Sequence, residues 1–301
     1  MSIIRYKNVD WSVPFLFNNQ KFLVNVISYL AQADIESPIR RAYGYMTNTW
    51  NGQEHGMQRF RDVGNSLKEM AHLNVTSEIC FTNYHLEEEH LKDRFCNELL
   101  DYGVAMQAEF LVSSDLLYNH IKSRYPNAKV SCSEVKALYE MEAGKEKEFY
   151  TRIYDKYEKI TLSPHYVKRG FLQDSYEDVS KFEVIANHTC LESCQFFKEH
   201  NESVENFELK RGEEINYYLQ CPKRETTIMD GVSKTLVLSK SELDSVVFDK
   251  GITKLRMYGF NFQPILFPEM FSTYVFETMG NYQHLGFFVD RSVIMQEGVQ
   301  F

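Results

Sequence analysis

Short β-like runs alternate with helix-like stretches along this sequence, and that alternation is the feature that most limits how the chain can fold. Each run ends in polar residues and is followed by apolar side chains at helical spacing. Such alternation is typical of parallel βα units. Eight runs are predicted to be strands: Trp11–Phe15, Ile39–Met46, Val75–Asn83, Val104–Val112, Ala128–Ser133, Lys159–Pro164, Phe182–His188 and Ile252–Gly259.

Eight strands with intervening helices favour an α/β fold, a single (β/α)8 TIM-like barrel over residues 1–301. In EEEHLKDRFCNELLDYG the apolar residues recur at helical spacing, and Gly103 is the predicted stop. The stretch SSDLLYNHIKSRYP begins with serines and an aspartate that suit a helix start, and it ends before Pro126. After the seventh strand a polar, acidic segment does not fit one helix, so a large insertion is expected at about residues 195–250.

Composition excludes several classes of protein. With 44% hydrophobic and 25% charged residues, the chain should fold around a sizeable core. A net charge of −9 argues against bulk binding to nucleic acids. The N-terminal residues do not resemble a secretory signal, and no apolar stretch approaches membrane-spanning length, so a cytoplasmic protein without membrane contact is expected. In that reducing compartment the six cysteines should be free thiols or metal ligands.

Polar residues gather at the ends of the predicted strands. In a (β/α)8 barrel the carboxyl ends of all strands meet at one mouth, where reactive groups and binding loops lie. We therefore expect the following positions to converge in space: Asn83, Ser131 to Ser133, Ser163 to His165, Asn187 to Cys190 and Tyr258 to Asn261.

Four segments carry a resemblance to a known family. They read EICFTNYHLEEEHLKDRFCNELLDYG, FLVSSDLLYNHIKSRYPNAKVSCS, FEVIANHTCLESC and LSKSELDSVVFDKGITKLRMYGFN. Their order resembles the collagenase-like peptidase family U32, in particular its barrel-only relatives of the UbiU/UbiV type. The most specific element is the apolar strand followed by Asn187, then Cys190 and Cys194, with Cys221 further on.

The resemblance implies a TIM-like barrel and, as in several relatives, an oxygen-sensitive [4Fe–4S] cluster held by four cysteines. Relatives include hydroxylation proteins, RNA-modifying proteins and reputed peptidases, so the resemblance implies a fold more firmly than a reaction. It also implies that a partner subunit can complete the site, as in the hydroxylation pair.

The cysteines supply the candidate metal ligands. Cys190 and Cys194 follow the seventh strand, where a loop or helical turn can aim both sulfur atoms inward, and Cys132 ends the fifth strand. With Cys221 from the insertion, these thiols form the predicted ligand set of the cluster. A zinc site in which His188 or His200 joins the cysteines is the alternative, and simple packing of free thiols is a third.

Three residues are candidates for catalysis. His188 lies beside the predicted metal site and can act as a general acid or base, or can bond to a neighbouring carbonyl group. Asn187 can orient a substrate carbonyl or hydroxyl group, or cap a loop. Arg169 can bind a carboxylate through two hydrogen bonds, or pair with a nearby acidic residue.

Four further residues are candidates for substrate binding. Asn83, His165 and Tyr258 lie at or just after predicted strand ends. Trp50 lies in YGYMTNTWNGQEHGMQRF, a glycine-bearing loop that can form a lid or a substrate wall over the barrel mouth, or an ordinary surface loop.

Motif searches narrow the reaction classes without identifying one. The sequence contains no phosphate-binding G-x-x-x-x-G-K-[ST], no G-x-G-x-x-G after a strand, no H-E-x-x-H and no G-x-S-x-G. The leading hypothesis is a metal-dependent modifying enzyme that carries out oxygen-independent hydroxylation of a small molecule, peptide or nucleobase with an iron–sulfur cluster. The alternatives are a zinc-dependent hydrolase or lyase of the peptidase type and a barrel-fold partner protein without catalysis.

Overall fold

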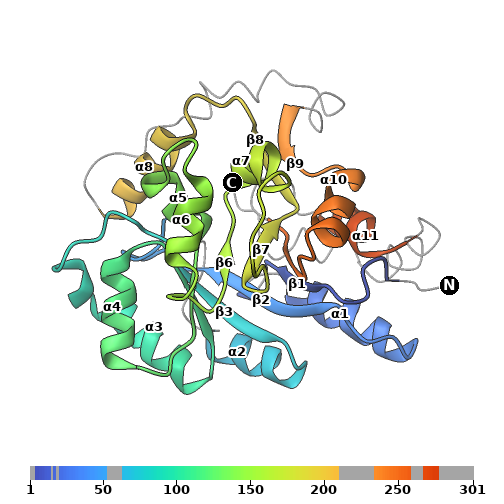
Figure 1. The fold of residues 1–301 in the computed structure, drawn as a ribbon. Helices are drawn as coiled ribbons and strands as arrows, with labels where there is room; N and C mark the ends of the chain where they lie inside the picture. Colours follow the sequence, from blue (N-terminus) through green and yellow to red (C-terminus); the bar gives the residue numbers. More distant parts are fainter. Residues whose placement is uncertain are drawn as a thin grey trace.

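Eight parallel strands close into a barrel around which the helices are arranged (Figure 1). The computed structural model describes residues 4–14, 16–17, 20–52, 63–209, 234–258 and 267–277, and the structural statements below concern these segments. The strands follow one another in chain order, and the last closes the ring against the first, so the predicted TIM-like barrel is confirmed. Its strands are β1 (Asp10–Val13), β2 (Ile39–Tyr45), β3 (Thr76–Phe81), β4 (Glu109–Val112), β5 (Val130–Cys132), β6 (Ile160–Thr161), β7 (Phe182–Ile185) and β10 (Lys254–Arg256).

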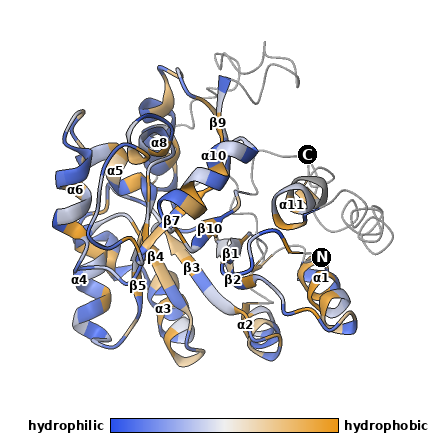
Figure 2. Cartoon of the chain, turned by 45° about the vertical axis from the view of Figure 1, so that its right-hand side comes forward, coloured by the Kyte–Doolittle hydropathy of each residue, from blue (hydrophilic) through white to orange (hydrophobic). Residues whose placement is uncertain are grey.

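The helices pack their apolar sides against the outside of the barrel. Hydrophobic residues concentrate on the strands and on the helix sides that face them, whereas the outer helix sides are largely hydrophilic (Figure 2). None of the helices in the described segments has the length and apolar character needed to cross a membrane. The helices are α1 (Gln20–Gln32), α2 (Val63–His72), η2 (His90–Lys92), α3 (Arg94–Ala105), α4 (Asp115–Arg124), α5 (Glu134–Glu140), α6 (Glu146–Ile153), α7 (Pro164–Tyr166), η3 (Val167–Phe171), α8 (Phe197–Glu208), α10 (Lys240–Asp244), η6 (Ser245–Asp249) and α11 (Phe267–Val275).

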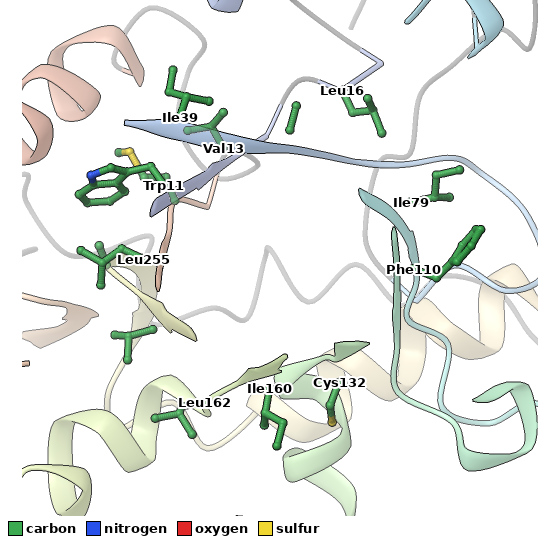
Figure 3. Close-up of a cluster of buried hydrophobic side chains, with 14 of the residues drawn as sticks. Trp11, Val13, Leu16, Ile39, Ile79, Phe110, Cys132, Ile160, Leu162 and Leu255 are labelled. Atoms are coloured by element: carbon green, nitrogen blue, oxygen red, sulfur yellow. The ribbon is translucent and has the colours of Figure 1, made fainter. Parts of the chain in front are cut away.

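Alternate residues of the strands point outward and form the main core between barrel and helices. This alternation is the ordinary period of a β-strand. Figure 3 labels ten side chains of this core, eight from the strands and two, Leu16 and Leu162, from the residues after β1 and β6. The strand residues are Trp11, Val13, Ile39, Ile79, Phe110, Cys132, Ile160 and Leu255, and all ten side chains are fully or almost fully buried.

A buried ionic network lies inside the barrel. Arg256 lies 2.6 Å from Glu78 and 3.2 Å from Glu183, and Lys159 lies 2.9 Å from Glu78 and 2.7 Å from Glu183. Ser12 donates a further hydrogen bond of 2.6 Å to Glu183. The two cations and two carboxylates neutralise one another, and this attraction offsets the free-energy cost of removing the charges from water.

The predicted seventh strand, Phe182–His188, belongs to two different sheets. Its first part pairs within the barrel up to Ile185, but β8 (Asn187–Leu191) leaves the barrel and pairs antiparallel with β9 (Thr235–Val237). The backbone of Ala186 makes the transition, since its N–H bonds to the barrel and its carbonyl group accepts from the segment after β9. The strand therefore directs the chain out over the barrel mouth, into the region where the insertion was predicted.

The predicted strand Val104–Val112 begins too early. Its first residues complete α3, which ends at Ala105, two residues beyond the predicted stop at Gly103. Gln107 then takes a left-handed conformation with φ of 58°, and the strand starts at Glu109. The turn is closed by hydrogen bonds to carbonyl groups of the last helical turn, a common way to end a helix that sequence periodicity does not reveal.

Candidate active site at the barrel mouth

A pocket of about 510 Å³ lies at the carboxyl ends of the barrel strands. Its lining comes from the residues that follow β5, β6, β7 and β10, and from α8 with the turn before it. The convergence of these strand ends was predicted from the sequence, and this pocket confirms it for Ser163, His165, His188 and Tyr258.

Glu134 is the acidic group most deeply placed in this pocket. It is the first residue of α5, directly after β5, and its side chain is buried although it lines the pocket. Ser133, which caps the helix, donates a hydrogen bond of 2.9 Å to its carboxylate. Burial raises the pKa of Glu134, with the charge of Arg256 acting in the opposite direction. A glutamate in the first turn is common in ordinary helices, so Glu134 does not stand out in the sequence.

His188 forms part of an aromatic wall. Its ring lies 5.1 Å from that of Tyr258 and 5.7 Å from that of Phe197. Its Nδ1 accepts a hydrogen bond of 3.3 Å from the backbone N–H of Cys190. An accepting Nδ1 places the ring proton of the neutral histidine on Nε2.

His165 continues this wall on the other side of Phe197. The two ring centres are 4.8 Å apart, with an angle of 67° between the ring planes. Burial is the main cause of the lowered pKa of His165, and the positive charge of nearby Arg169 lowers this pKa further. His165 is therefore neutral at neutral pH and suits hydrogen bonding to a ligand better than charge pairing.

Charged side chains lie at the rim of the pocket. Arg169 bonds to the carboxylate of Glu192 at 3.0 Å and to its backbone carbonyl group at 2.8 Å. Arg169 lines the pocket. Its side chain pairs with a nearby acidic residue, which is one of the two roles considered from the sequence. Lys198, which also lines the pocket, lies 5.6 Å from the ring centre of Tyr139.

Asn187 binds the backbone of a neighbouring loop, the second of the two roles considered from the sequence. Its side-chain N–H donates to the carbonyl oxygen of Tyr258 at 2.8 Å, and its oxygen accepts from the N–H of the same residue at 2.6 Å. Both ends of the amide thus bind the backbone that follows β10. The side chain fixes the position of Tyr258 and so shapes the site without presenting its own amide to a ligand.

Asn83 and Trp50 are also structural. Asn83 is fully buried and donates to the carbonyl oxygens of Asn51 and Glu205, each at 3.1 Å. Trp50 is fully buried too, and its indole N–H donates to the carbonyl oxygen of His90. Neither side chain lines the pocket, so contact of Asn83 and Trp50 with substrate stays a prediction from the sequence.

The predicted cluster ligands are not brought together by the described residues. Cys132 points outward into the apolar layer beside Ile160 (Figure 3), and its burial raises the pKa of the thiol, which disfavours the thiolate that a metal needs. Cys190 lies in β8 and not in a loop, whereas Cys194 lines the pocket. Cys221 lies outside the described residues.

A four-cysteine cluster therefore does not fit the part of the chain that the structure describes. The outward direction of Cys132 follows from strand parity, because Ser131 and Ser133 occupy the alternate positions. Within the same segments no group of three or more His, Cys, Asp or Glu side chains is arranged to hold a metal ion. The zinc site, in which His188 or His200 joins the cysteines, stays a prediction, because Cys221 lies outside those segments.

Comparisons with known proteins identify the fold. A solved structure described as "The Structure of the U32 Peptidase Mk0906" is similar to this chain, with a TM-score of 0.55 and 11% sequence identity. The match covers 85% of this chain and 94% of that chain. No family model and no curated protein matches the sequence. The predicted resemblance to the U32 peptidases is thus confirmed for the fold, which is what a likeness at this identity shows.

Proposed function

We propose that this chain is an enzyme of the U32 type that modifies a small molecule or a peptide by proton transfer in the pocket at the barrel mouth. One observation carries the proposal: a buried carboxyl group, Glu134, and two histidines, His165 and His188, line one pocket at the strand ends. Catalytic groups of barrel enzymes gather at this end.

The chemistry of these groups suits general acid–base catalysis. Because burial raises the pKa of Glu134, the carboxyl group keeps its proton to higher pH than an exposed glutamate and can donate it to a leaving group. His188 lines the same pocket, and its Nε2 can carry the ring proton because Nδ1 accepts a hydrogen bond. Proton transfer by such groups supports a hydrolase or lyase reaction, the class considered as the alternative from the sequence.

The pocket favours a substrate of modest size with an anionic end. Its volume of about 510 Å³ falls within the range of about 300–1,000 Å³ that is usual for small ligands. Arg169 and Lys198 at the rim can attract a carboxylate, as in a small organic acid or the end of a peptide. The aromatic wall formed by Phe197, His188 and Tyr258 can pack against the remainder of such a ligand.

Oxygen-independent hydroxylation with a [4Fe–4S] cluster, the reaction first expected, has less support. It needs thiolates at the barrel mouth, and Cys132 lies on the far side of the barrel wall from the pocket. A further partner subunit and a cytoplasmic location remain predictions from the sequence.

The test is product formation from panels of dipeptides and small carboxylic acids, followed by mass spectrometry. Wild-type protein is compared with Glu134→Gln, and with Glu98→Gln as a control at an exposed helix position. We expect product formation that falls by about 10²-fold or more in Glu134→Gln and is unchanged in the control, since loss of a general acid has effects of this size. Equal turnover by wild type and Glu134→Gln contradicts the assigned role.

A further inference from the structure

Glu205 on α8 places its carboxyl group in an aromatic cage beside the pocket. Its side chain has no exposed surface, and Oε2 accepts a hydrogen bond of 2.7 Å from the hydroxyl group of Tyr139. Oε1 accepts from the backbone N–H of Tyr84 at 3.2 Å, and Nε2 of His85 lies 3.3 Å from Oε2. Glu205 does not stand out in the sequence, because an acidic residue in a polar helix resembles many exposed ones.

The cage joins α8 to two other parts of the barrel mouth. Tyr139 belongs to α5, and its ring stacks on Tyr84 with 4.6 Å between the ring centres. Asn83, just after β3, donates to the carbonyl oxygen of Glu205. The helices α5 and α8 lie beside each other (Figure 1), and both contribute residues to the lining of the pocket.

We propose that Glu205 is a positioning residue that holds α8 against α5 and so sets the position of one wall of the pocket. The contacts that support this are the three polar groups around the carboxyl group and the stacked rings that enclose it. The proposal concerns the position of the wall and holds whichever reaction takes place in the pocket.

The surroundings of Glu205 favour the neutral acid. Burial is the largest cause, and it raises the pKa of Glu205 to about 8, with hydrogen bonds from Tyr139 and Tyr84 acting in the opposite direction. The titratable and charged groups that face the cage are Tyr139 and, more distantly, Lys136 and Glu140 from α5, Tyr84 and His85 from the segment after β3, and Lys198 and Glu202 from α8 itself.

The sign of the pH dependence follows from these values. When α8 separates from the cage, the pKa of Glu205 returns towards its ordinary value of 4.5, so the open form loses its proton more readily. Opening of α8 should therefore become more favourable by about tenfold per pH unit between about pH 5 and pH 8, and level off above that range.

Hydrogen exchange of the full-length protein between pH 5 and pH 8 tests the proposal. Protection factors, which correct for the intrinsic effect of pH, are measured for the amides of α8 and, as an internal reference, of α4. The variant Glu205→Gln keeps a neutral amide of the same shape in the cage. The matched control is Glu202→Gln, the same change at an exposed position of the same helix.

In wild type and in Glu202→Gln we expect the protection factors of α8 to fall by about tenfold per pH unit relative to those of α4. In Glu205→Gln we expect the protection factors of α8 relative to α4 to be independent of pH. The proposal is overturned if α8 and α4 respond to pH alike in wild type, or if Glu205→Gln shows the same fall as wild type. Should Glu205→Gln fail to fold, the comparison of α8 with α4 in wild type still decides.

Discussion

The guanidinium group of Arg256 lies 2.6 Å from the carboxylate of Glu78 across the inside of the barrel, and neither side chain has any exposed surface. Lys159 and Glu183 complete this network, and the ring of Tyr43 lies 3.6 Å from the guanidinium carbon. Other TIM barrels mostly fill this space with layers of branched apolar side chains. Here the layer below the active-site pocket is instead held together by charge.

Removing Arg256 should strongly destabilise the fold. In Arg256→Met the carboxylates of Glu78 and Glu183 lose one of their two cations while remaining buried, and such a loss costs about 3–5 kcal/mol. The free energy of unfolding from urea titration measures it. The control is Arg169→Met, whose exposed ion pair with Glu192 should contribute below about 1 kcal/mol. A cost for Arg256→Met as small as the control's contradicts the role of the network.

The same network should make the protein sensitive to acid. The cations Lys159 and Arg256 hold the pKa of Glu183 far below its ordinary value of 4.5, against the effect of burial. A lowered pKa contributes stability that is complete above pH 4.5 and is lost as the pH falls below it.

Glu183→Gln lacks this contribution, so the difference in unfolding free energy between wild type and variant should narrow from pH 7 to pH 3. Urea titrations at several pH values follow this difference. The exposed Glu98→Gln serves as a control whose difference stays small. If the gap between wild type and Glu183→Gln is the same at pH 7 and pH 3, the carboxylate does not have the predicted lowered pKa.

Glu134 should show the opposite dependence. Its pKa is raised by burial, so ionisation opposes folding, and wild-type stability falls as the pH rises above 4.5. Glu134→Gln removes this loss. Its thermal midpoint should therefore equal or exceed that of wild type at pH 8, while activity is lost, as is common where a catalytic group is kept at a cost in stability. A marked destabilisation at pH 8 instead indicates that Glu134 is structural.

Much of the architecture could be predicted from the sequence, because strand and helix periodicities repeat so regularly. Side-chain direction was harder. Cys132 and Ser133 are neighbours at the end of β5, yet one faces the helices and the other faces the barrel mouth, and a shift of one residue in a predicted strand reverses this assignment.

The candidate site was predicted in part for a related reason. His165, His188 and Tyr258 lie at or just after predicted strand ends, and the structure brings them to one pocket. Glu134 and Glu205 carry no such signal, because acidic residues are frequent in helices and their burial depends on packing between segments far apart in the chain.

The outward position of Cys132 gives a prediction about metal content. Cys132→Ala should leave the iron, zinc and sulfide content of anaerobically purified protein unchanged, because the thiol faces the apolar layer. The smaller alanine leaves part of the apolar layer unfilled, so we expect the free energy of unfolding to fall by about 1–2 kcal/mol. Loss of bound iron with Cys132→Ala, in protein that remains folded, contradicts this placement.

Retention of a ligand by the pocket tests the central claim most directly. Wild-type protein, Glu134→Leu and the exposed control Glu98→Gln are each equilibrated with a mixture of small acids and peptides, separated from free ligand and analysed by native mass spectrometry. We expect at least one compound to remain bound to wild type and to the control. The same compound should be absent from Glu134→Leu, because the carboxyl group that this variant lacks lines the pocket. A compound retained equally by all three proteins, or no compound retained by wild type, contradicts a functional site at the barrel mouth.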